Sequence, residues 1–537
     1  MTLVVASPMK LVADLDGMSK SLELPMQLGQ SLIPTLTSFF EPVMTNVTRE
    51  TLDSLDVTRP MAVIWLAKGS DAPAGWCAAI AFKEHAVASD ALQRIGTVGT
   101  QSEGTSERRL ASGEVVWGAV KDRELLLSSS RENLLAAGAL AITAQGTPIT
   151  GQALFTMSPS GMARSTGQSL DVVASTFLRS ALADMQKDAS GAGKPLTPAL
   201  MKTIEALLPI LARPLGEIAV VRVSIDIDAG RGVLLRAEAR PTSGSGLAAK
   251  AAASSPYAFD SDLPVSSDAS GVVAWGDMSH WLADGMKVVE ASGPAGQAAS
   301  KDMWAVFGEA LDGGSCAADL SSLPIRMMCS LSVRPGIDAS SALTKYVASL
   351  QSSNAWEAEL DGHKPKAIKV KHTGKVVETE KVIERKDPLT MSVMKTVMGG
   401  NVLRTALTIK NGRLLLATGP KPREMLGSYG KPQQPMKAAA PILARTLLDT
   451  AGADFVGSVD MASILSRAAA TAKDAGTPSL GMMATMPGVA DLRAPVVGTG
   501  QAKGGPAIEL QIPFGSLQNV ARLVSVLMGQ MGTQPAR

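Results

Sequence analysis

A chain of 537 residues is too long for one hydrophobic core, so about two to four domains are expected. Its composition, 45% hydrophobic and 19% charged, is that of a folded globular protein rather than a disordered one. The formal net charge of +2 excludes a protein that binds nucleic acid through its whole surface. No stretch approaches the ~18 to 20 apolar residues that span a bilayer, so no transmembrane segment is expected.

The first element expected along the chain is a short strand that feeds a helix. Residues 9–22, MKLVADLDGMSKSL, are an apolar run, then Asp, then a segment with helical spacing. The same pattern returns from Gly151, from Ser270 and from Ala453. We expect Asp16, Asp277 and Asp460 to accept hydrogen bonds from backbone amides at the start of each helix. These aspartates therefore receive a structural role, because no catalytic partner lies at a suitable spacing.

Further pairs of similar segments keep the same order in both parts of the chain. WCAAIAFKEHAVASDALQRI from Trp76 resembles MCSLSVRPGIDASSALTKYV from Met328, and KDRELLLSSSRENLLAAG from Lys121 resembles KNGRLLLATGPKPREMLGS from Lys410. GVLLRAEARPTSGSGLAAKA from Gly232 resembles PAIELQIPFGSLQNVARLV from Pro506. The matched positions are Asp16 and Asp277, Leu92 and Leu343, Leu126 and Leu415, Ser158 and Asp460, and Pro241 and Pro513. Five collinear blocks indicate a tandem duplication with insertions.

The expected elements mix strands and helices within each half. Residues 220–228 and 234–240 alternate and flank DAGRG, which predicts an antiparallel hairpin with one solvated face. Helices are expected at 198–212, 278–291, 301–311, 338–351 and 518–530. The predicted fold class is α+β, with two tandem, duplicated halves that each pack an antiparallel sheet against helices. The halves are 1–251 and 269–537, and the Ser-, Ala-, Asp- and Pro-rich residues 252–268 are expected to link them.

One charged segment, residues 362–386, stands apart from the rest. It holds seven lysines and Arg385 against three glutamates, a net charge of +5. Its alternation around Thr373 and Gly374 predicts a basic hairpin, inserted in the second half, whose Lys and Glu side chains face each other. It is either a solvated, self-paired arm or a contact site for an anion: nucleic acid, a lipid headgroup or an acidic polysaccharide. Without interleaved aromatic residues, nucleic acid is disfavoured. The candidate anion contacts are Lys364, Lys366, Lys369, Lys371 and Lys375.

The three cysteines exclude a disulfide scaffold and a multi-cysteine metal site. Cys316 and Cys329 are near enough in sequence to form a bridge in an oxidising compartment. Cys329, however, aligns with Cys77 in the repeated strand, where a small core residue is wanted. We therefore expect free buried thiols rather than a disulfide.

The catalytic motifs found in the sequence lack the partner residues that their reactions require. The pattern G-x-S-x-G is absent, and S-x-x-K occurs at Ser7–Lys10 and at Ser392–Lys395. The second match lies on a plausible helix, but HTG at 372–374 precedes it where a hydrolase of penicillin-binding type needs K-T-G to follow. The glycines of 293–301 fit no phosphate loop and suggest a loop between helices. The four histidines share no metal-ligand spacing. The sequence predicts no catalytic residue, no metal ligand and no cofactor.

The capped strand–helix units LVADLDGMSKSL and VVAWGDMSHWL, with RELLLSSSRENLLAA, give the chain a resemblance to a known class. It resembles large exported bacterial proteins of unknown function built from two sheet-and-helix halves. The resemblance covers most of the chain and implies an export signal, but no activity and no site residues.

These observations lead to three hypotheses for function. The first is a non-enzymatic, extracytoplasmic binding or scaffold protein, in the periplasm or at the cell surface, whose partner is a protein or envelope component. The second is a carrier of an apolar ligand or lipid in a Met-rich cavity between the halves, and the third is a serine hydrolase that uses Ser392 and Lys395. The amino terminus is not a secretory leader as it stands, so the protein is cytosolic or its leader has been trimmed.

Overall fold

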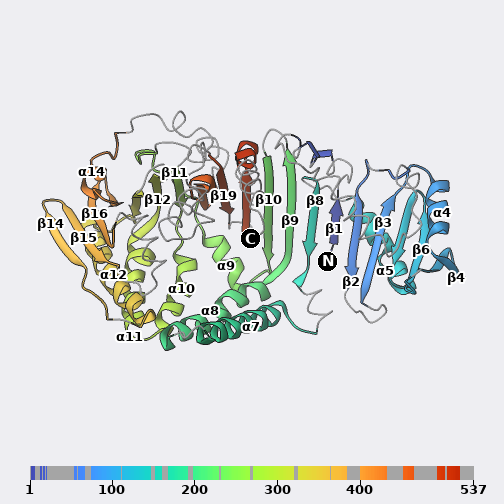
Figure 1. The fold of residues 1–537 in the computed structure, drawn as a ribbon, viewed down its shortest axis with the longest axis horizontal. Coiled ribbons are helices and arrows are strands. Elements are labelled where there is room, and N and C mark those ends of the chain that lie inside the picture. The colour runs from blue at the N-terminus through green and yellow to red at the C-terminus, as the bar shows by residue number, and fades with distance from the viewer. Residues whose placement is uncertain are drawn as a thin grey trace, which may run out of the picture. The chain divides into compact units, whose positions relative to one another are not determined.

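The computed structural model divides the chain into two compact units (Figure 1). Unit 1 comprises Met1–Val173 and Ile218–Pro241, and unit 2 comprises Ala174–Glu217 and Thr242–Arg537. The strands within each unit pair antiparallel and pack against helices, which confirms the α+β class. The residues that the structure describes are 2–5, 13–14, 16–17, 20, 54–56, 58–66, 74–110, 112–146, 151–159, 167–191, 197–228, 232–265, 270–319, 324–362, 364–383, 400–431, 452–464, 493–501 and 505–519.

Unit 1 contributes strands β1 to β10 and two helices that cover its sheet. The strands are β1 (Thr2–Val5), β2 (Met61–Leu66), β3 (Gly75–Ala81), β4 (Thr97–Ser102), β5 (Thr105–Arg109), β6 (Val115–Lys121), β7 (Glu124–Ser128), β8 (Ala153–Met157), β9 (Ile218–Asp228) and β10 (Gly232–Pro241). The helices are α4 (His85–Arg94) and α5 (Arg131–Gln145), and α7 (Leu170–Gly191) leads the chain onward into unit 2. The predicted hairpin of 220–228 and 234–240 is confirmed as β9 and β10, which pair from Gly232 opposite Asp228.

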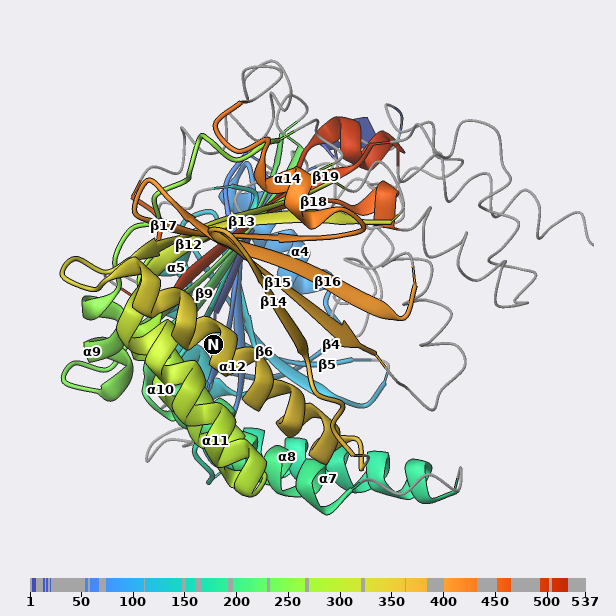
Figure 2. The ribbon, with the colours of Figure 1, turned by 90° about the vertical axis from the view of Figure 1, so that its left-hand side faces the viewer.

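Unit 2 contributes strands β11 to β20 and a larger set of helices. The strands are β11 (Ser270–Trp275), β12 (Leu311–Asp319), β13 (Arg326–Val333), β14 (Lys369–Thr373), β15 (Val376–Val382), β16 (Val402–Lys410), β17 (Arg413–Thr418), β18 (Phe455–Asp460), β19 (Pro495–Gln501) and β20 (Ala507–Ile512). The helices are α8 (Pro198–Gly216), α9 (Gly246–Ala253), α10 (Ser279–Ala291), α11 (Pro294–Met303), the π-helix η1 (Trp304–Ala310), α12 (Ala339–Leu360) and α14 (Pro422–Leu426). Figure 2 shows α10, α11, α12 and α8 gathered on one side of the strands of this unit.

The two units pair their strands in the same order. In unit 1 the order is β4-β5-β6-β7-β3-β2-β1-β8-β9-β10. In unit 2 it is β14-β15-β16-β17-β13-β12-β11-β18-β19-β20, so that every strand has its counterpart ten numbers later. This agreement supports the predicted duplication, which as an evolutionary event stays a prediction.

Residue register shows the correspondence at single positions. One continuous row of paired residues crosses each sheet. In unit 1 it runs Gln101, Ser106, Gly118, Leu127, Ala78, Val63, Leu3, Phe155, Val223 and Ala237. In unit 2 it runs His372, Val377, Leu407, Leu416, Cys329, Cys316, Val273, Gly457, Gly498 and Leu510. The matched turns between β6 and β7 and between β16 and β17 both hold a left-handed residue, Asp122 and Asn411, types that tolerate positive φ.

Each sheet has a hydrophobic core on both faces. In unit 1, one face packs on α4 through a cluster around Ile80, Leu125 and Leu127, and the other packs on α5 through Ala79, Leu126 and Leu134. In unit 2, Leu331, Leu414 and Leu416 face α12, whereas Met328, Leu415 and Ala417 face α14 and the segment around Leu263. The consecutive leucines of β7 and β17 thus serve opposite faces, because successive strand residues alternate.

The predicted helix-start role of the aspartates is confirmed at two of three positions. A side-chain oxygen of Asp277 accepts a hydrogen bond of 2.9 Å from the amide of Ser279, and Asp460 accepts one of 3.1 Å from the amide of Ala462. The strand expected within 9–22 is wrong, because Ala13, Asp14 and Asp16 are helical. The counterpart of β11 is β1, which begins at Thr2, so Asp16 is not the equivalent of Asp277.

Several predicted boundaries differ from the structure. The residues expected to form a linker, 252–268, fall in unit 2, where Leu263 is 1% exposed and packs in the core. The segment 293–301, expected as a loop, forms most of α11, because Pro294 occupies the first turn, where proline is favoured. The helix expected at 338–351 continues as α12 to Leu360, and the helix expected at 518–530 lies largely outside the described residues.

The basic hairpin is confirmed, but it is not an insertion. Strands β14 and β15 pair Lys369 with Glu380 and Lys371 with Glu378 around the turn at Gly374. Their counterparts in unit 1 are β4 and β5, which form the same edge of the sheet. The extra residues of unit 2 lie instead in the longer α12 and in the longer connection from β15 to β16.

The expectation of three free thiols is wrong for two of them. Cys316 and Cys329 are directly opposite each other on β12 and β13 and form a disulfide. Cys329 is the counterpart of Ala78, not of Cys77, which lies one residue away and on the opposite face of its sheet. A slip of one residue in the sequence alignment therefore hid the pairing of Cys329 with Cys316.

Candidate functional site

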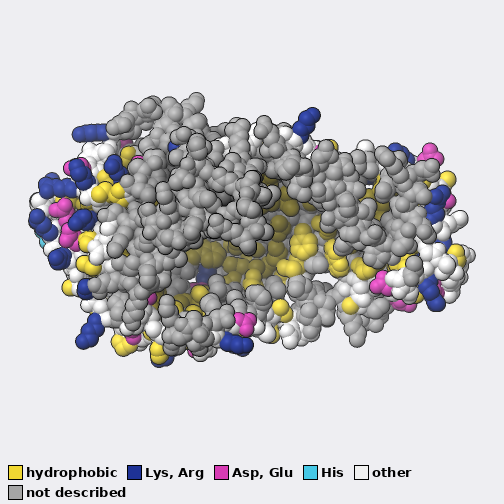
Figure 3. Space-filling model, viewed as in Figure 1, with side chains coloured by type: hydrophobic (Ala, Val, Ile, Leu, Met, Phe, Trp, Pro, Cys, Tyr) yellow, Lys and Arg dark blue, Asp and Glu magenta, His cyan; other side chains and the backbone are white. Residues whose placement is uncertain are grey.

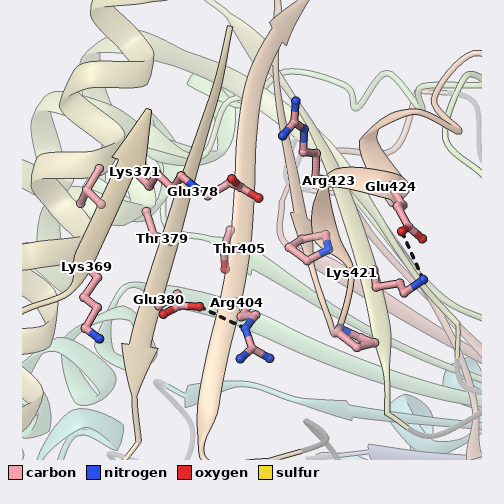
Figure 4. A pocket seen from close by; sticks show the side chains of 13 residues that line it. Lys369, Lys371, Glu378, Thr379, Glu380, Arg404, Thr405, Lys421, Arg423 and Glu424 are labelled. Carbon is pink, nitrogen blue, oxygen red and sulfur yellow. Dashed lines mark hydrogen bonds and ion pairs between the residues drawn. The ribbon is translucent and has the colours of Figure 1, made fainter. Parts of the chain in front are cut away.

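A charged groove opens at the edge of unit 2 where β14, β15 and β16 meet the loop that begins α14 (Figure 4). Its volume is about 710 Å³. The lining residues come from four separate stretches of the chain: Lys369, Val370, Lys371, Glu378, Thr379, Glu380, Arg404, Thr405, Pro420, Lys421, Pro422, Arg423 and Glu424. Figure 3 shows Lys and Arg side chains gathered over this end of unit 2.

Strand geometry places the charges of the groove in two rows. Lys369, Glu380 and Arg404 are opposite one another on three neighbouring strands, and Lys371 is opposite Glu378 in the next row. The alternation of strand residues puts these side chains on the face that α14 covers, while Val377 and Leu407 point into the core beside α12. Pro420 and Pro422 fix the loop that forms the opposite wall.

The ion pairs within the groove leave part of its positive charge unpaired. Arg404 Nε lies 3.2 Å from Glu380 Oε1, and Lys421 Nζ lies 3.2 Å from Glu424 Oε1. Lys369, Lys371 and Arg423 are exposed, and none of the described residues forms an ion pair with them. The predicted positions of lysines opposite glutamates across the hairpin are therefore confirmed. The predicted ion pair between Lys369 and Glu380 is not formed, because Glu380 forms its ion pair with Arg404.

The structure brings together two of the five predicted anion contacts. Lys369 and Lys371 line the groove, whereas Lys364, Lys366 and Lys375 are exposed elsewhere on the hairpin and its approach. Sequence reasoning missed Arg404, Lys421 and Arg423, because they follow the hairpin by many residues and reach it only through the pairing of β16 with β15. The signal available in the sequence was the second basic run, KPR at 421–423, between the strand and the helix predicted in the segment from Lys410.

The corresponding edge of unit 1 lacks this site. By register, Val115 stands in the place of Arg404, and Thr97, which pairs with Arg109, stands in the place of Lys369, which pairs with Glu380. Val115 is 37% exposed, and neither Val115 nor Thr97 carries the positive charge of its counterpart in unit 2. The positive groove is therefore a property of unit 2 alone and not a requirement of the shared strand arrangement.

A second polar cluster lies on the same face of the unit 2 sheet and surrounds the buried Asp260. The Asp260 carboxylate accepts hydrogen bonds from Tyr429, at 2.7 Å, and from Ser330, and Arg413 lies 3.6 Å away. Burial alone raises the pKa of Asp260, but the hydrogen bonds from Ser330, Tyr429 and the Asp262 amide, with the charge of Arg413, outweigh it and lower the pKa. Burial, then the bond to Asp260, raises the pKa of Tyr429 to about 12. This cluster fastens the segment around Asp260 to the sheet.

Other candidate chemistry finds no assembled site. Among the described residues no group of three or more His, Cys, Asp or Glu side chains is placed to hold a metal ion. The His85 ring, 3.4 Å from the Ser89 hydroxyl, contacts the backbone carbonyl of Asp122 rather than a carboxylate, so it lacks the orienting acid of a triad. Ser392 and Lys395 lie outside the described residues. Burial raises the pKa of the Cys77 thiol to about 12, which keeps it unreactive.

The helices that the structure describes include none with both the length and the apolar character that a bilayer crossing requires. Comparison with known proteins found no matching family model, no matching curated protein and no matching solved structure.

Proposed function

We propose that the protein is an extracytoplasmic binding protein, without catalytic activity, that holds an anionic ligand in the groove of unit 2. One observation carries the proposal: Lys369, Lys371 and Arg423 face the groove with no ion pair to any described residue. Cations that already have carboxylate partners gain little from a ligand, whereas unpaired ones can form charge-assisted hydrogen bonds with it.

The disulfide supports the proposed compartment. Structural disulfides persist in the periplasm and at the cell surface, and they are rare in the reducing cytosol. The Cys316–Cys329 bridge lies within the sheet of unit 2, with Cys329 5% exposed in its core. An extracytoplasmic site therefore suits the covalent chemistry of unit 2 better than a cytosolic one does.

The proposed function is tested by reversing charge in the groove. The double variant Lys369→Glu/Lys371→Glu should elute from a dextran sulfate column at clearly lower salt, and bind soluble dextran sulfate at least about tenfold more weakly. The matched control is Lys121→Glu/Lys202→Glu, which makes the same charge change at exposed positions away from the groove. Equal losses in both variants would assign the binding to net charge and contradict the proposal.

A second candidate function, the carriage of an apolar ligand, is favoured by one separate feature. On the sheet face that α4 covers in unit 1, β8 to β10 present Phe155, Val223 and Leu235 without charge, and Ile225 there is 37% exposed. Apolar side chains are visible over β8 and β9 in Figure 3. The described part of this face is Val, Ile, Leu, Ala and Phe with Met157, so it is aliphatic rather than Met-rich as expected.

Unit 2 repeats this apolar strip on β18 to β20. Phe455, Gly500 and Ile508 pair across three strands, and Ile508 is 65% exposed. Native mass spectrometry after gentle purification should show a bound lipid if this second function is correct. Detection of the ligand-free mass alone, with no uptake of added fatty acid, would contradict this second function.

A further inference from the structure

The groove of unit 2 mixes positive and negative side chains in a way that narrows the class of its ligand. This inference rests on the proposed function and names what the anion is. Lys369 and Lys371 project from one face of β14, about 7 Å apart, as alternate residues of a strand do. Arg423 belongs to the far wall, beyond β15 and β16, so at least about 10 Å of sheet separates the two sets of cations. A ligand whose acid groups are spaced along a chain can meet both sets at once.

Carboxylates occupy the space between these cations. Glu378 and Glu380 project from β15, between the lysines of β14 and Arg404 of β16 (Figure 4). Arg404 neutralises Glu380, whereas none of the described cations forms an ion pair with Glu378, which accepts only a long hydrogen bond, 3.5 Å, from the Thr373 hydroxyl. A ligand of dense, continuous negative charge would meet Glu378 at close range and bind more weakly than one whose charges are spaced apart.

A carboxylate that faces a ligand is a hydrogen-bond acceptor for hydroxyl groups. The groove therefore offers donors for acid groups at Lys369, Lys371 and Arg423, and an acceptor for hydroxyl groups at Glu378. A ligand that satisfies both carries separated acid groups on a chain rich in hydroxyls. We infer that the groove binds an acidic polysaccharide of the uronic acid type.

The other anionic classes fit less well. None of the thirteen lining residues is aromatic, so the groove has no platform on which bases stack, as single-stranded nucleic acid requires. A lipid surface is contacted by protruding basic and apolar side chains, whereas Lys369 and Lys371 border a hollow whose apolar members are Val370, Pro420 and Pro422.

The test compares the binding of three polymers that differ in their negative charge and in their hydroxyl groups. Polygalacturonate carries both, its methyl ester keeps the hydroxyls without the charge, and polyphosphate has the charge without the hydroxyls. With the full chain in isothermal titration at one fixed salt concentration, polygalacturonate should bind at least about tenfold more tightly than either of the others. Vesicles containing phosphatidylglycerol should bind no better than neutral ones.

The variant Glu378→Gln gives the sharper result, because it should move two affinities in opposite directions. Removal of the negative charge should strengthen polyphosphate binding, while replacement of the charged carboxylate acceptor by the weaker neutral amide acceptor should weaken polygalacturonate binding several-fold. If polyphosphate binds as tightly as polygalacturonate, or if both affinities rise in Glu378→Gln, the polysaccharide assignment is overturned and the anion-binding function stands. If neither polymer responds to Lys369→Glu/Lys371→Glu, the proposed function itself fails.

Discussion

At the first residue of β7 and of β17, the two units form ion pairs in which the strand residue has opposite charge. The first residue of β7 is Glu124, which pairs with Arg59 at 2.7 Å, and the first residue of β17 is Arg413, which pairs with Asp260. Glu124 and Asp260 are buried, at 3% and 7% exposure. A buried charge is tolerated only with a partner, so both members of each pair had to change together if one arrangement arose from the other.

Replacement of Tyr429 by Phe tests the Asp260 cluster. The variant loses a charge-assisted hydrogen bond of 2.7 Å in a buried site, so the free energy of unfolding should fall by about 1.5 to 3 kcal/mol. In the wild type, the lowered pKa of Asp260 means that its contribution is present above the ordinary carboxyl pKa and is lost as pH falls through the native value.

Tyr429 has the opposite sign, because its pKa is raised to about 12. Its contribution is complete below the ordinary tyrosine value and is lost as pH rises towards about 12. Urea unfolding across both pH ranges, for wild type and Tyr429→Phe, measures these slopes. Identical pH profiles would show that the hydrogen bond from Tyr429 to Asp260 contributes nothing to the pH dependence of stability.

At the scale of elements, the basic hairpin illustrates how one segment serves the core and the surface together. Val377 on β15 is 5% exposed and contacts the cluster of Leu407 and Leu414, while its neighbours Glu378 and Lys371 border the groove. Because strand residues alternate, charge on one face is compatible with burial of the other. The high charge of this hairpin therefore does not indicate that the fold of unit 2 is independent of it.

Deletion of residues 362–386 should strongly destabilise unit 2. It removes Val370 and Val377 from the cluster and uncovers Leu407, a loss on the order of 3 kcal/mol or more from apolar burial alone. Denaturant unfolding followed by circular dichroism measures the change. Lys369→Glu/Lys371→Glu serves as the control for charge and should unfold close to wild type. A deletion variant as stable as wild type would show that the hairpin is a dispensable appendage.

At the scale of the whole molecule, two units share a strand order but differ in their covalent and charged features. The disulfide of unit 2 stands where unit 1 has Val63 and Ala78, and Lys369 and Arg404 of the groove stand where unit 1 has Thr97 and Val115. Each unit buries hydrophobic clusters of its own on both faces of its sheet. The shared strand order is compatible with either set of side chains, so it is the side chains that distinguish the units.

The variant Cys316→Val/Cys329→Ala installs the unit 1 residues and tests this view. Loss of the cross-link should lower the stability of unit 2 by about 3 kcal/mol, the chain-entropy value for a loop of this length. Calorimetry of the full chain should show one transition moving to lower temperature while the other stays. Reducing agent should shift the wild type in the same way and leave the variant unchanged; a shift of every transition would contradict separate cores.

The sequence by itself determined the α+β class, the β9–β10 hairpin, the repeated order of segments and the roles of Asp277 and Asp460, because each depends on local alternation or on a cap within a few residues. The disulfide and the groove were decided by the register in which distant strands pair. Whether Cys329 meets Cys316, or whether Arg404 and Arg423 join Lys369 at one groove, depends on which distant strands pair and by which residue. A shift of one position reverses the face of every side chain, and no local pattern records that choice.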